Sequence, residues 1–77
     1  MPKRRKHSAA DIKMIVARNI RNLRETRGES QLGLAQRIGL NRSMLNSWEK
    51  GTRVPTLQSL QRIANGLEVE VWKLLCD

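Results

Sequence analysis

The chain has 77 residues and a formal net charge of +8, with 15 Lys and Arg against 7 Asp and Glu. This length allows one domain with a small core. The single His7 falls in the basic N-terminal stretch and the single Cys76 lies next to the C-terminus, and we find no metal-ligand spacing, internal disulfide or nucleophile–base pair in the sequence. We therefore expect no cofactor, no metal and no enzymatic activity.

Residues 1–7 are predicted to form a flexible basic arm ahead of a domain at 8–77. The arm carries four consecutive cations, Lys3, Arg4, Arg5 and Lys6, which repel one another. One interpretation is an arm that adds DNA backbone contacts or enters a neighbouring groove. The others are a solubilising tail, a cloning remnant or, on composition alone, a nuclear import signal.

A first helix is predicted to begin near Ala9, because Ser8 and Asp11 resemble a capping box. Gly28 ends it as a glycine stop. Its apolar residues recur at helical spacing and predict an inward stripe. These residues are Ile12, Ile15, Val16, Ile20 and Leu23.

Two short helices with a tight break are predicted within residues 31–48. Ser30 can cap the first, and Gly39 can end it because glycine adopts positive φ without a Cβ clash. Asn41 can cap the second, in which Leu45 and Trp48 point inward. Two helices joined by a short glycine-containing turn are typical of a helix-turn-helix unit.

The outward face of the second short helix carries hydrogen-bonding and cationic side chains and no carboxylate. Its members are Arg42, Ser43, Asn46, Ser47 and Lys50. Such a face suits a DNA groove lined with base edges and flanked by phosphates. The alternative interpretation is a helical hairpin with an ordinary polar surface.

Two further helices are predicted after the loop that contains Arg53. Thr56 can cap the first of them, with an inward stripe of Leu57, Leu60, Ile63, Ala64 and Leu67. Gly66 is expected to weaken its last turn.

The second of these helices spans Val69 to Leu75, in which Val71 and Leu74 can reach the core. Trp72 and Leu75 lie on a different side, and we expect them to form a dimer interface within residues 67–76; the alternative is that Trp72 folds back over the core.

Charge is distributed unevenly along the chain. Residues 1–30 have a balance of +6, residues 31–64 have +4 with Glu49 as the single acid, and residues 65–77 have −2. A basic body with a mildly acidic end is typical of a protein that binds a polyanion with one side. No apolar run is long enough to span a membrane, and no apolar signal region follows the basic N-terminus. We therefore expect a cytoplasmic, nucleoid-associated protein without a membrane partner or small-molecule ligand.

The pattern of residues from about Ile20 to Leu74 resembles the phage repressor/Cro-type (XRE-like) helix-turn-helix family. The matching positions are Ser30-Gln31, Leu34-Ala35, Gly39-Leu40, Arg42-Ser43, Leu45, Trp48-Glu49, Gly51, Pro55, Leu57, Leu60, Ile63-Ala64 and Leu67. Stand-alone controller proteins of restriction-modification systems and small phage repressors look most similar. The resemblance implies an all-α, five-helix, lambda-repressor-like domain that binds palindromic operators in double-stranded DNA as a homodimer and regulates transcription.

Residue roles follow from that resemblance. Gln31 matches a phosphate-contacting glutamine, and Arg42, Ser43 and Ser47 match base-reading positions, with Asn46 beside them. A guanidinium at Arg42 can bind guanine O6 and N7 together, although a phosphate contact is the alternative. Further DNA backbone contacts are expected from Asn41, Lys50, Arg53 and the arm. We interpret Asn41 as a helix cap rather than a base reader.

Two implied features concern architecture and partners. Arg24 and Glu49 match a partly buried structural ion pair. A second functional class is the antitoxin of a toxin–antitoxin pair, which binds a toxin protein as well as its own operator. A third is nonspecific nucleoid binding.

Overall fold

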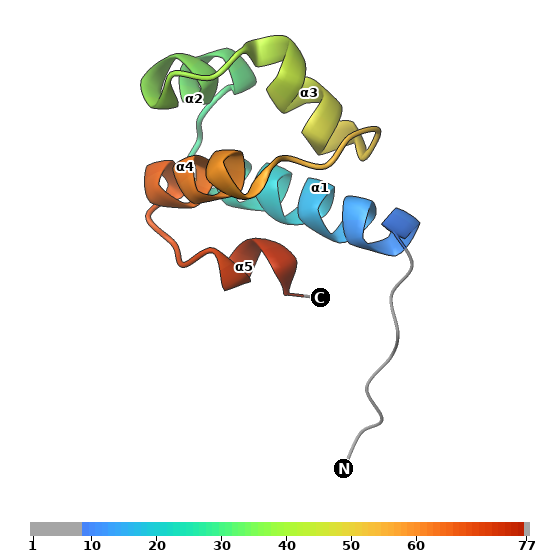
Figure 1. Cartoon of the computed structure of the whole chain (residues 1–77). Helices are drawn as coiled ribbons and strands as arrows, with labels where there is room; N and C mark the ends of the chain where they lie inside the picture. The colour runs from blue at the N-terminus through green and yellow to red at the C-terminus, as the bar shows by residue number, and fades with distance from the viewer. Residues whose placement is uncertain (1–8, 77) are drawn as a thin grey trace.

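The computed structural model describes residues 9–76, and these residues form five α-helices (Figure 1). The helices are α1 (Ala9–Thr26), α2 (Gln31–Ile38), α3 (Arg42–Lys50), α4 (Leu57–Leu67) and α5 (Trp72–Leu75). The all-α, five-helix prediction is confirmed. The predicted arm, with Lys3, Arg4, Arg5 and Lys6, lies outside the described residues.

Side-chain caps place the starts of α2, α3 and α4. Ser30 Oγ accepts a hydrogen bond from the Gly33 N–H at 2.9 Å, and Asn41 Oδ1 accepts one from the Ser43 N–H at 2.7 Å. Thr56 caps α4 in the same way. These bonds satisfy amides that have no partner inside the helix. At the other end of α2, Gly39 adopts a φ of 71°, which turns the chain toward α3.

The core lies where α1 and α4 meet the other helices. In Figure 1, α1 and α4 occupy the middle, with the α2–α3 pair on one side and α5 on the other. α1 packs against α3, α4 and α5, and α2 packs against α3 and α4. The buried cluster is almost entirely aliphatic, with Trp48 as its aromatic member: Val16, Ile20, Leu34, Ala35, Leu45, Trp48, Leu60, Ile63, Ala64, Leu67 and Leu74.

The last helix is shorter than predicted. Helical structure begins at Trp72 rather than Val69, because Glu68 ends α4 with a φ of 59° and the following residues turn the chain. The Val69 N–H then donates to Ala64 O at 3.0 Å. Asn19 of α1 holds the end of α5, since its Nδ2 donates to the carbonyls of Leu74 and Cys76.

Two apolar residues predicted to point inward are exposed. Leu57 is 80% exposed and Ile12 is 40% exposed. Both lie in the first turn of their helices, and at this end of α4 the buried residue is Pro55 in the preceding loop. Trp72 is 58% exposed, so the alternative in which it folds back over the core is wrong. None of the described helices has the length and apolar character needed to cross a membrane.

Gly66 permits close packing between α4 and α2. A Cβ placed on Gly66 would overlap Cγ2 of Ile38 and lie 3.8 Å from Cδ1 of Leu34. The helix-propensity cost of glycine, about 1 kcal/mol relative to alanine, is therefore offset by the approach of two helices. Ile38 packs against the core, and a Cβ at position 66 would force its side chain to shift.

We expect Gly66→Ala to lower the free energy of unfolding by about 1–3 kcal/mol, because overpacking outweighs the gain in helix propensity. Urea denaturation measures this change. In an Ile38→Ala background the overlapping methyl is gone, so the same substitution should cost less than in the parent. Equal costs in both backgrounds would contradict the packing explanation.

Candidate nucleic-acid interface

The outward face of α3 is open to solvent at both of its ends. Arg42 and Ser43 are exposed in the first turn, and Lys50 is exposed in the last. Asn46 and Ser47 lie between them and are half-buried. The other side of the helix is anchored in the core through Leu45 and Trp48, which are 0% and 2% exposed. The five side chains singled out in the sequence therefore share one face.

The start of α2 and the face of α3 enclose a polar hollow of about 260 Å³. It is lined by Gln31, Arg42, Ser43 and Asn46. Three residues expected to read bases thus lie beside Gln31, which is expected to contact phosphate. The hollow offers amide, hydroxyl and guanidinium groups and no carboxylate, a set suited to base edges and phosphate oxygens.

A buried ion pair lies beneath this face. Glu49 is 3% exposed, and its carboxylate accepts hydrogen bonds from Arg24 Nε at 2.7 Å and Arg24 Nη2 at 2.9 Å. Arg24 Nη1 also donates to the carbonyl of Glu29 at 2.7 Å. The hydrogen bond to Glu49 raises the pKa of the Arg24 guanidinium above its ordinary value, against the opposing effect of desolvation. The pair joins α1 to the last turn of α3.

The side chain of Gln31 connects the buried ion pair to Asn46 on the outward face of α3. Its Nε2 donates to Glu49 Oε1 at 3.1 Å and to Asn46 Oδ1 at 3.3 Å. Both hydrogens of the amide are thereby engaged within the protein, which leaves none for a phosphate in this conformation. Sequence reasoning missed these two bonds, because partners 15 and 18 residues away have no local signal.

Two other candidate residues use their polar groups within α3. Asn41 Oδ1 accepts from the amides of Ser43 and Met44, as a cap does. The hydroxyl of Ser47 donates to the Ser43 carbonyl at 3.1 Å, so only its lone pairs remain available to a ligand. Arg53 is exposed in the loop that follows α3.

A surface ion pair joins the α1–α2 loop to α2. Arg37 donates through Nε and Nη2 to the carboxylate of Glu29, both at 2.8 Å, and Nη2 also donates to the Gly66 carbonyl. The hydrogen bond from Arg37 lowers the pKa of Glu29. This cation of α2 therefore braces the fold, and sequence reasoning did not identify the pair.

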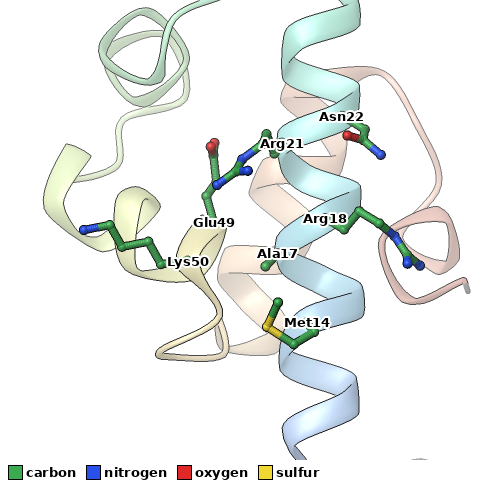
Figure 2. Close-up of a pocket in the computed structure, with 7 residues that line it drawn as sticks. All are labelled: Met14, Ala17, Arg18, Arg21, Asn22, Glu49 and Lys50. Atoms are coloured by element: carbon green, nitrogen blue, oxygen red, sulfur yellow. The ribbon is translucent and has the colours of Figure 1, made fainter.

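A second hollow, of about 460 Å³, lies between α1 and the end of α3 (Figure 2). Arg21 extends from α1 toward α3, whereas Arg18 and Lys50 extend away from the hollow in opposite directions. Ala17 and Met14 also line this hollow. The polar groups do not converge as they do in a small-molecule site. Within residues 9–76, no three His, Cys, Asp or Glu side chains come together in a way that could hold a metal ion.

Comparison with known proteins points to DNA-binding regulators. A family model described as helix-turn-helix (HTH_3) matches residues 20–71. Control protein C.SmaI of Serratia marcescens is 42% identical over 65 residues, which cover 84% of this chain and 77% of that protein. The restriction-modification controller protein C.AhdI of Aeromonas hydrophila superposes with a TM-score of 0.77 and 32% identity, over 80% of this chain and 94% of that one.

An HTH_3 family transcriptional regulator from Vibrio cholerae has the same fold. It superposes with a TM-score of 0.82 and 34% identity, over 87% of this chain. This chain spans 38% of the length of the Vibrio protein. The common part is therefore the helix-turn-helix domain.

We expect Arg24→Met to lower the free energy of unfolding by about 3–5 kcal/mol, because it leaves the Glu49 carboxylate buried without its cation. Chemical denaturation measures the loss. The control is Arg53→Met, which removes an exposed cation in the loop after α3 and should change stability by no more than about 0.5 kcal/mol.

The double variant Arg24→Met/Glu49→Met removes both charges and should recover most of the lost stability. If the double variant is no more stable than Arg24→Met alone, the stranded charge is not the cause.

Proposed function

This chain belongs to the HTH_3 helix-turn-helix family of DNA-binding regulators, and we propose that it regulates transcription as a homodimer on a palindromic operator. In this proposal α3 enters the major groove of each half-site. The observation that carries it is the exposed, carboxylate-free face of α3, whose opposite side is anchored in the core. Such a helix presents base-reading groups in a defined orientation.

Arg42 is the main base reader in this proposal, with Ser43, Asn46 and Ser47 beside it. Arg42 is exposed at the start of α3 and lines the polar hollow. Its fork of N–H donors matches guanine O6 and N7. Ser47 takes part as an acceptor, since its hydroxyl hydrogen is engaged by the Ser43 carbonyl.

Phosphate contacts are assigned to groups around the ends of α2 and α3. Lys50 and Arg53 are exposed cations beyond the reading face. At Gln31 we assign the main-chain N–H, because amides in a first turn lack helical partners and favour an anion. Asn41 contributes by holding the first turn of α3, and residues 3–6 add cations for the flanking backbone.

The biological role that fits best is control of restriction-modification genes. The support is the similarity to control protein C.SmaI and to the controller C.AhdI, which extends over at least 80% of this chain in both cases. Such a protein is a cytoplasmic regulator and not an enzyme. The small phage repressors are the neighbouring group within the same family.

The dimer interface is assigned to residues 67–76. Trp72 and Leu75 are 58% and 46% exposed, which is a large apolar surface for a short helix. α5 packs against α1 and α4. A partner placed on α5 therefore leaves α3 open to DNA.

Arg42→Ala should reduce discrimination at one or two base pairs of each half-site, by about 1–3 kcal/mol at each. Lys50→Ala should instead weaken binding to all sequences alike and lower the salt dependence of affinity, because it removes one phosphate contact. Competition binding over a series of single mismatches separates the two effects. Identical profiles for the two variants would contradict base reading by Arg42.

Trp72→Glu should convert the dimer to a monomer, because it places a charge in the apolar centre of the proposed interface. Sedimentation analysis without DNA measures the change. The control is Leu32→Glu, which adds the same charge at an apolar residue of α2 that is 47% exposed. A Trp72→Glu protein that remains as dimeric as the control would remove α5 from the interface.

A further inference from the structure

The buried carboxylate of Glu49 determines which group donates and which accepts in the hydrogen bonds that link Glu49, Gln31 and Asn46. An ionised carboxylate only accepts hydrogen bonds, and the pairing with Arg24 satisfies Glu49 in that form. The group that Gln31 turns toward Glu49 Oε1 must therefore be its Nε2 amide. This removes the usual ambiguity in the orientation of a glutamine side chain.

The orientation of the Gln31 amide in turn fixes the orientation of the Asn46 amide. The second hydrogen of Gln31 Nε2 can only be accepted by an oxygen, which places Asn46 Oδ1 against Gln31 at 3.3 Å. The opposite side of the Asn46 amide carries Nδ2, which is a donor. Asn46 is half-buried and lines the polar hollow of the candidate interface.

We infer that Asn46 donates to a keto oxygen, O6 of guanine or O4 of thymine, at one base pair of each half-site, so that guanine or thymine is selected on the strand it contacts, and that Gln31 is the positioning residue that enforces this choice. In the major groove guanine O6 and thymine O4 accept hydrogen bonds, whereas the amino groups of adenine and cytosine donate them. An Asn46 amide held with Nδ2 outward faces an acceptor on a keto base and a second donor on an amino base.

This inference departs from the usual behaviour of asparagine, which binds adenine through its oxygen and its nitrogen together. Here the oxygen is held against Gln31. The inference rests on the proposed function, since it requires that α3 reads bases in the major groove.

Selection from a random DNA pool with the parent protein and with Asn46→Ala tests the inference. The base pair whose preference disappears in Asn46→Ala is the one that Asn46 reads. Because every base pair contains one keto and one amino base, base analogues at that pair are needed to identify the group that is read. Removal of the keto oxygen (2-aminopurine for guanine, 5-methyl-2-pyrimidinone for thymine) should weaken binding by the parent roughly fivefold more than removal of the amino group (purine for adenine, 2-pyrimidinone for cytosine), the value of about one hydrogen bond. This ratio is the keto preference. A larger loss of affinity on removal of the amino group than of the keto oxygen, or no pair that responds to Asn46→Ala, would overturn the inference while leaving the regulator proposal intact.

Two variants change the orientation directly. Gln31→Met fills a similar volume without hydrogen bonding, so the Asn46 amide can rotate and the keto preference should fall to within about twofold. The matched control is Gln36→Met, the same substitution at an exposed position of α2, which should keep the full preference. Asn46→Asp replaces the outward donor by an acceptor and should invert the preference toward amino bases.

Retention of the full keto preference by Gln31→Met, or by Asn46→Asp, would overturn the assignment. A parent protein that selects no sequence at all would overturn both this inference and the proposed function. Because the readout is base preference at one position, a general loss of stability in a variant would weaken all sites alike and would not imitate the expected result.

Discussion

The guanidinium of Arg24 holds the carboxylate of Glu49 through two N–H donors at 2.7 and 2.9 Å, and this buried pair fixes the last turn of α3 against α1. Taking both charges out of water is costly, so the pair persists because each is compensated by the other and by further hydrogen bonds. Gln31 supplies one of these bonds and thereby connects the start of α2 to the last turn of α3. A structural ion pair thus has a consequence at the surface, in the orientation of Asn46.

The α2–α3 unit is held on the rest of the domain in two different ways. At α3 the contact is electrostatic and hydrogen-bonded, through Glu49, as well as apolar, through Leu45 and Trp48. At α2 the contact with α4 depends on shape complementarity, because Gly66 has no side chain and leaves room for Ile38. In a domain of this size the burial of apolar surface alone contributes only modest stability. Specific fits and directed bonds therefore matter more for the position of α3 than the amount of buried surface.

Much of the fold could be predicted because its signals are local. Ser30, Asn41 and Thr56 each cap a helix a few residues away, and Gly39 needs only its own backbone freedom to end one. α5 was predicted too long, because a positive φ at Glu68, a residue other than glycine, gave no warning of the turn that follows α4. Leu57 matched the helical stripe and is nevertheless exposed, since periodicity gives the direction of a side chain and not the extent of the neighbouring helix.

The outward face of α3 and the pairing of Arg24 with Glu49 could also be named from the chain, the first from helical spacing and the second from family resemblance. Only the tertiary structure decided which hydrogen-bonding groups on that face are available. Gln31 was expected to contact phosphate, and the fold engages both hydrogens of its side-chain amide with Glu49 and Asn46, which leaves its main-chain N–H for that contact. The physical reason is that helix starts and faces depend on residues a few positions apart. The direction of a hydrogen bond depends on partners that meet only when α1, α2 and α3 are packed together.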